Sequence, residues 1–181
     1  MFSNLKNVFK VPDLRNKILF VMAMVALYRV GVAIRVPGID ADAVRQFKAA
    51  ANTQGALGFF NLFSGGAFAS FSIFALGIMP YITASIIMQV LGVVIPKLEK
   101  LQQEGAVGQR KITQYTRYGT LGLALFQSLG IALALESSAG LVISPGFGFR
   151  LTAIFTLTAG TMFLMWLGEQ MTERGIGNGI S

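Results

Sequence analysis

Long apolar runs separated by short polar segments dominate the chain. Four of these runs, residues 16–36, 73–96, 118–135 and 151–168, approach or exceed the roughly 20 residues that a helix needs to cross a bilayer. Few charged residues lie within them, and charges gather at their ends. The pattern predicts an all-α membrane protein, a multi-span bundle of transmembrane helices.

One stretch is too long for a single straight crossing. No Lys, Arg, Asp or Glu occurs between Ala49 and Pro96, and a continuous helix over it would measure roughly 70 Å against a hydrocarbon core about 30 Å thick. The paired glycines and serine of Asn61–Gly66 favour a break. We therefore expect an outer loop over 37–58 with a short polar helix at Ala41–Ala51, then a re-entrant element at 59–72 before the second span.

The distribution of charge independently predicts the same arrangement, a re-entrant element followed by a single span. Residues 1–15, with a possible interfacial helix ended by Pro12, and residues 97–117 are both basic, so both are predicted to be cytoplasmic. Only one full crossing then fits between Ala49 and Pro96. This places 136–150 outside and 169–181 inside, as a loop leading to a fifth span.

Composition supports the membrane class and narrows the chemistry. The 181 residues are 54% hydrophobic and 13% charged, with a formal charge of +7 and neither His nor Cys. The basic residues beside apolar runs indicate topology signals and anionic lipid contact, with no direct nucleic-acid role. Thiol chemistry and a histidine base are absent, so a serine nucleophile at Ser64 would lack its partner and no enzyme is expected.

A few polar residues inside the apolar runs have two interpretations. Arg29 lies near the end of the first run, where its side chain is expected to reach outward; pairing inside the bundle is the alternative. Gln127 needs a partner or water at mid-span, and Thr83 is a candidate unless its hydroxyl bonds its own helix. Gly119, Gly122 and other small residues of the third and fourth runs favour close helix packing.

Several longer strings are specific to one family. They are Phe63–Gly66, Ser72–Ile82, Arg110–Ile112, Gln114–Thr120 and Gly168–Ser181. In this order they strongly resemble the SecY family of protein-conducting channels, over essentially the whole chain. The resemblance corresponds to the amino-terminal part of that family, with Ser181 at the start of the fifth span, so the chain looks like the front portion of a longer polypeptide.

The resemblance implies site residues by position. The plug that closes the channel would comprise Asn61, Leu62, Phe63, Ser64, Gly65, Gly66, Ala67, Phe68, Ala69, Ser70 and Phe71. The central pore ring would include Ile78, Ile82 and Ile180, although lipid contact or core packing is the ordinary interpretation of Ile78 and Ile82. The lateral gate, through which transmembrane segments reach lipid, would be lined by Thr83, Ile86, Ile87, Phe126 and Gln127. Thr83 and Gln127 are expected to form part of a polar cluster that favours the shut state.

The resemblance also implies a function and partners. The protein would be the central subunit of the Sec translocation channel in a bacterial plasma membrane, with a cytoplasmic amino terminus. It would pass unfolded secretory polypeptides across the membrane and release transmembrane segments sideways into lipid. Expected partners are SecE and SecG, the SecA motor or a translating ribosome, signal peptides, nascent polypeptides and membrane lipids, without a cofactor or metal. A solute or ion transporter with a broken midplane helix is the alternative, although the spans lack the interior Asp or Glu typical of coupled transporters.

Overall fold

The computed structural model describes residues 11–51, 61–62, 64–138 and 140–179. Within these ranges the chain forms helices, turns and isolated bridges, with no strands. The helices are α2 (Pro12–Ala33), α3 (Ala41–Ala51), α5 (Met79–Val94), α6 (Pro96–Gln103), α7 (Ala106–Ser137) and α8 (Phe147–Arg174). The protein is thus an all-α bundle.

The long helices have the length and composition of membrane spans. In the described part of the chain, α2, α7 and α8 are each long and apolar enough to cross a bilayer. α5 and α6 pass the same test together, although the chain bends by 101° between them. The fold is therefore that of a multi-pass membrane protein, with three spans or, counting the bent pair, four.

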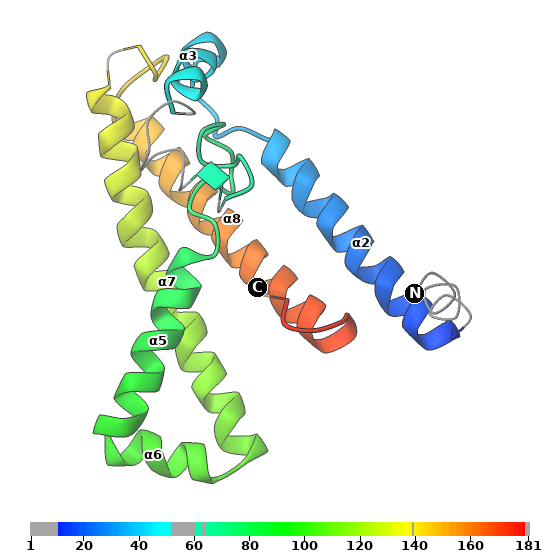
Figure 1. The fold of residues 1–181 in the computed structure, drawn as a ribbon. Helices are drawn as coiled ribbons and strands as arrows, with labels where there is room; N and C mark the ends of the chain where they lie inside the picture. Colours follow the sequence, from blue (N-terminus) through cyan, green and yellow to red (C-terminus); the bar gives the residue numbers. More distant parts are fainter. Residues whose placement is uncertain (1–10, 52–60, 63, 139, 180–181) are drawn as a thin grey trace.

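The arrangement has two distinct ends. α8 lies between α2 and α7, and α3 lies across one end of the bundle (Figure 1). At the opposite end, α5, α6 and α7 enclose a triangle (Figure 1). Two loops at the α3 end are joined by backbone hydrogen bonds, in which the N–H of Asp40 donates to the carbonyl of Leu141 and the N–H of Ile143 donates to the carbonyl of Gly38, both at 3.0 Å.

The helix boundaries follow local chemistry. α2 begins at Pro12, which suits the first helical position because its missing N–H would have no partner there. Pro12 therefore starts a helix; the interfacial helix that it was expected to end falls in residues 1–10, which lie outside the described residues. Asp40 caps α3, because its carboxylate accepts hydrogen bonds from the N–H groups of Asp42 and Ala43 at 2.8 and 3.1 Å.

Two stretches differ from the sequence prediction. The basic stretch 97–117, expected as a loop, is mostly helical: α6 begins at Pro96, and α7 continues from Ala106 without interruption into the third apolar run. The second apolar run, expected from residue 73, becomes a regular helix only at Met79. The segment before Met79 therefore contains more irregular backbone than the apolar pattern indicates.

Candidate functional site

The described residues among 61–78 form mainly turns, and we call this stretch the turn segment. Beyond a short helical start at 61–62, its described residues are not a regular helix, so the predicted plug helix is replaced by irregular backbone. Positive φ angles at Gly65 (58°), Gly66 (90°), Phe71 (45°) and Gly77 (60°) explain why helix cannot continue. Phe63, within the predicted plug, lies outside the described residues.

The turn segment satisfies much of its own backbone. Asn61 is central: its carbonyl accepts from the N–H of Gly66 at 2.9 Å, and its side-chain Oδ1 accepts from the N–H of Ala69 at 3.1 Å. The hydroxyl of Ser64 accepts from the N–H of Phe68 at 3.0 Å. Internal hydrogen bonds of this kind are what irregular backbone needs away from water.

The interior of the turn segment is packed. Ala67 and Ala69 are fully buried, Phe71 is 5% exposed and Phe74 is 1% exposed. Phe74 shares a buried cluster with Leu164 and Leu167 of α8. The turn segment is thus part of the core between α2 and α8.

α8 approaches the turn segment through a glycine. A Cβ at Gly160 would lie 2.8 Å from the carbonyl carbon of Ile73 and closer still to its oxygen. Gly31 of α2 makes a similar approach to the ring of Phe74, with a built Cβ 2.9 Å from Cδ2 and closer to two other ring atoms. Only glycine fits at either position without movement of the backbone or the ring.

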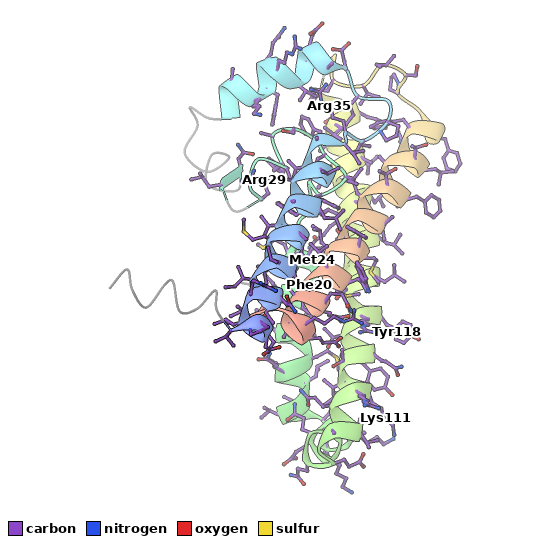
Figure 2. All side chains as sticks on the ribbon, turned by 90° about the vertical axis from the view of Figure 1, so that its right-hand side faces the viewer. Phe20, Met24, Arg29, Arg35, Lys111 and Tyr118 are labelled. Carbon is purple, nitrogen blue, oxygen red and sulfur yellow. The ribbon has the colours of Figure 1, made fainter. Side chains whose placement is uncertain are left out.

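Two side chains of α2 also donate to the turn segment. The hydroxyl of Tyr28 donates to the carbonyl oxygen of Ser64 at 2.6 Å, and Nη1 of Arg29 donates to the carbonyl oxygen of Gly65 at 3.2 Å. Arg29 is exposed, and among the described residues its guanidinium contacts this backbone oxygen and forms no ion pair. Figure 2 labels Arg29 on α2. Beyond α2, the N–H of Val36 donates to Phe71 at 3.0 Å and extends the contact.

A pocket of about 340 Å³ lies between the turn segment, α2 and α8. It is mainly apolar, and its lining includes Met24, Tyr28, Ser64, Gly65, Ile78, Leu164, Leu167 and Gly179. Ile78, predicted for the pore ring, is therefore part of this wall. Ile82 lies one turn further along, half-buried in α5. Ile180 lies outside the described residues, but its neighbour Gly179 lines the same pocket.

The residues predicted for the lateral gate lie on α5 and α7, which pack together. Ile86, Ile87 and Phe126 are exposed, with Phe126 at 76%. The hydroxyl of Thr83 donates to the carbonyl of Met79 at 2.9 Å, within its own helix. No hydrogen bond among the described side chains joins Thr83 to Gln127, which is half-buried. Thr83 thus adopts the within-helix alternative, and the polar cluster is not formed by these two residues alone.

Other polar contacts hold α7 against α8. The hydroxyls of Ser128 and Thr158 lie 3.3 Å apart in a buried setting. Nε and Nη2 of Arg117 donate to the two carboxylate oxygens of Glu169 at 3.0 and 2.6 Å. The sequence analysis missed this ion pair, because residues so far apart in the chain carry no local signal of contact. By contrast, no atom of the described residues lies within 4 Å of a Cβ built at Gly122 or Gly130 of α7, so neither glycine makes a close contact with another described helix.

These features define a class: a multi-span helical membrane protein in which an irregular, internally hydrogen-bonded segment is packed between two long apolar helices. A family model of SecY matches residues 72–181. The protein translocase subunit SecY of Escherichia coli (strain K12) is 56% identical over 173 residues, which cover 93% of this chain and 39% of that protein. The chain belongs to the SecY family.

Other SecY proteins show a similar degree of identity to this chain. The protein translocase subunit SecY of Buchnera aphidicola subsp. Acyrthosiphon kondoi is 56% identical over 173 residues, covering 93% of this chain and 48% of that protein. That of Halalkalibacterium halodurans is 49% identical over 183 residues, covering all of this chain and 42% of that protein. The chain thus spans less than half the length of these curated relatives.

Proposed function

We propose that the full-length protein is the central subunit of a protein-conducting channel. It passes unfolded secretory polypeptides across a bacterial plasma membrane and releases transmembrane segments sideways into lipid. The relatives, named as protein translocase subunits, support this proposal. The observation that carries it is the turn segment: irregular backbone is tolerated at membrane depth only when it is buried in protein or faces a watery cavity, and here it borders a pocket lined by Ile78.

In this proposal the plug, residues 61–71, blocks the passage until a polypeptide arrives. Its fold is held by local hydrogen bonds and by packing between α2 and α8, so it can leave its seat as a unit. Ile78, Ile82 and Ile180 then contribute to a ring of apolar side chains, which excludes water and ions by dewetting and yields to a passing chain. The rest of the ring comes from outside this chain.

Lateral release is assigned to the exposed faces of α5 and α7. Ile86, Ile87 and Phe126 offer apolar side chains to a hydrophobic signal helix. Gln127 contributes polarity that favours the shut state, and Thr83 adds its hydroxyl when it leaves its bond to Met79. A signal helix that binds the open state better shifts the population toward it.

The proposed topology puts the amino terminus and residues 97–117 in the cytoplasm, as the basic residues of both favour. The four spans are α2, α5, α7 and α8. The work of pushing a polypeptide comes from partners, either the SecA motor or a translating ribosome, and SecE and SecG complete the channel. We assign no catalytic step, no cofactor and no nucleic-acid contact to this chain.

Site-specific photo-crosslinking tests the proposal. A photoreactive residue at Ile82 of the full-length protein should crosslink to a secretory chain arrested in transit. The matched control is Val93 on the same helix, which is 81% exposed and should crosslink to lipid. Equal crosslinking of the arrested chain from both positions, or none from Ile82, would contradict a passage lined by this helix.

A further inference from the structure

Two adjacent side chains of α2 hold two adjacent carbonyl groups of the turn segment. Tyr28 donates its hydroxyl proton to the oxygen of Ser64 at 2.6 Å, and Arg29 donates from Nη1 to the oxygen of Gly65 at 3.2 Å. These carbonyls lie where the chain turns through positive φ at Gly65 and Gly66. The oxygen of Ser64 also accepts from the N–H of Ala67 at 3.0 Å within the turn segment, so Tyr28 adds a second donor to it, and Arg29 supplies a donor to the oxygen of Gly65.

Arg29 is in an unusual position for a cation. It lies within the apolar run of α2, and none of the ion pairs formed by the described residues includes it. A charge in a spanning helix is costly unless it reaches water or a polar partner. Its side chain is exposed, and its described hydrogen-bond partner is a backbone carbonyl of the turn segment, so this contact depends on the position of that segment.

Tyr28 is held in place by a run of aromatic rings. Its ring stacks on Phe74 with centroids 5.6 Å apart and an interplanar angle of 4°. Phe74 stacks in turn on Phe163 of α8, at 6.0 Å and 4°, and Phe163 contacts Trp166. The hydroxyl of Tyr28 is therefore positioned by contacts that reach across to α8, and a shift between α2 and α8 would move it away from Ser64.

We propose that Tyr28 and Arg29 form a latch that sets how readily the plug leaves its seat, and hence how strong a signal sequence must be to open the channel. The inference rests on the proposed function. The latch binds backbone oxygens, so it holds the plug whatever side chains the plug carries. Separation of α2 from α8 releases it, because the aromatic stack that positions Tyr28 then opens.

The test uses the full-length protein in membranes, in a version whose only cysteine replaces Ala69. Ala69 is fully buried in the plug, and cysteine is close to it in size, so a thiol reagent reacts only when the plug has moved. When opening and closing are fast compared with labelling, the labelling rate reports the open population. The two latch variants are Tyr28→Phe, which keeps the aromatic stack, and Arg29→Gln.

The controls are matched in chemistry. Tyr118→Phe removes a hydroxyl from a tyrosine that is 70% exposed on α7. Arg45→Gln removes a guanidinium whose partner is the exposed Asp42 on α3. All variants are compared at equal amounts of inserted protein, which separates a loosened plug from a failure to fold.

The latch predicts that Tyr28→Phe raises labelling of the cysteine at position 69 about five-fold, the effect of losing one net hydrogen bond. Arg29→Gln should raise it by at least about two-fold, and neither control should change it. Export of a passenger with a weakened signal sequence should rise in the same two variants.

The two readouts separate the latch from the proposed function. Labelling that is unchanged in both latch variants, or raised equally in the controls, overturns the latch. If labelling rises in the latch variants but the protein without these substitutions exports no passenger, the latch is supported and the proposed function is overturned. Raised labelling with export of weak signals unchanged overturns the latch as a determinant of signal strength.

Discussion

The close approach between α8 and the turn segment at Gly160 provides a direct test of the packing. Gly160→Ala adds one methyl group that would lie 2.8 Å from the carbonyl carbon of Ile73 and closer to its oxygen. Carbon atoms pack best at about 3.5–4.0 Å, so α8 and the turn segment must separate by about 1 Å. The obstacle is backbone, which cannot rotate aside as a side chain can.

The expected cost follows from two opposing terms. Overpacking of this kind costs about 1–3 kcal/mol, and the better helix propensity of alanine returns about 0.5–1 kcal/mol. The net change should be a destabilisation of about 1 kcal/mol. Gly122→Ala is the matched control, because Gly122 also lies inside a long helix but no atom of the described residues lies within 4 Å of a Cβ built there. At this position only the gain in helix propensity is expected.

The assay is the thermal denaturation midpoint of the purified full-length protein in detergent. Only the order of the midpoints is compared, because unfolding of a large membrane protein need not be a two-state transition and the midpoints then do not convert directly to free energies. Gly160→Ala should fall below the unaltered protein, and Gly122→Ala should equal or exceed it. A midpoint for Gly160→Ala at or above that of Gly122→Ala would refute the close approach.

Three further predictions concern polar residues. Hydrogen bonds from two backbone N–H groups at the start of α3 lower the pKa of Asp40 below its usual 3.8. The stabilisation of α3 by this carboxylate should be complete above pH 3.8 and should be lost as the pH falls through the lowered pKa. Hydrogen exchange of the α3 amides should therefore quicken in acid in the unaltered protein, and this acid dependence should be lost in Asp40→Ala. In a double-mutant cycle, Arg117→Gln and Glu169→Gln should show a coupling of about 1 kcal/mol, as for a partly exposed ion pair; additive effects would argue against the pair. Gln127→Leu should increase export of passengers with weak signal sequences, and unchanged export would count against its role in the shut state.

Much of the helical framework could be predicted from the sequence, because apolar length is a strong local signal. The short helix over Ala41–Ala51 was predicted with the same bounds, since turn residues before it and the capping carboxylate of Asp40 are local features. The break near Asn61–Gly66 was likewise indicated by its glycines. The structure accordingly confirms a helical, multi-span membrane protein.

The conformation after the break could not be predicted in the same way. Residues 73–78 are as apolar as a spanning helix, yet they form turns, because Phe71 and Gly77 adopt positive φ and Phe74 is buried between Gly31 and Gly160. That packing depends on residues distant in sequence. Hydrophobicity alone does not distinguish a buried turn from a buried helix.

The candidate site was only partly visible in the sequence for the same reason. Family resemblance indicated the plug and Ile78, but nothing local marks Tyr28 as a donor to Ser64, 36 residues away. Arg29 was recognised as unusual, because a charge inside an apolar run is a local signal. Its partner, a backbone oxygen, carries no signature in the amino-acid sequence.

The central claim is that residues 61–71 close a passage through the protein, and ion conductance across a planar bilayer tests it most directly. The full-length channel should pass almost no current without a polypeptide substrate, and the same channel lacking residues 61–71 should show frequent openings. Equal, low conductance of the two proteins in the same bilayer would contradict the claim that this segment is the closure.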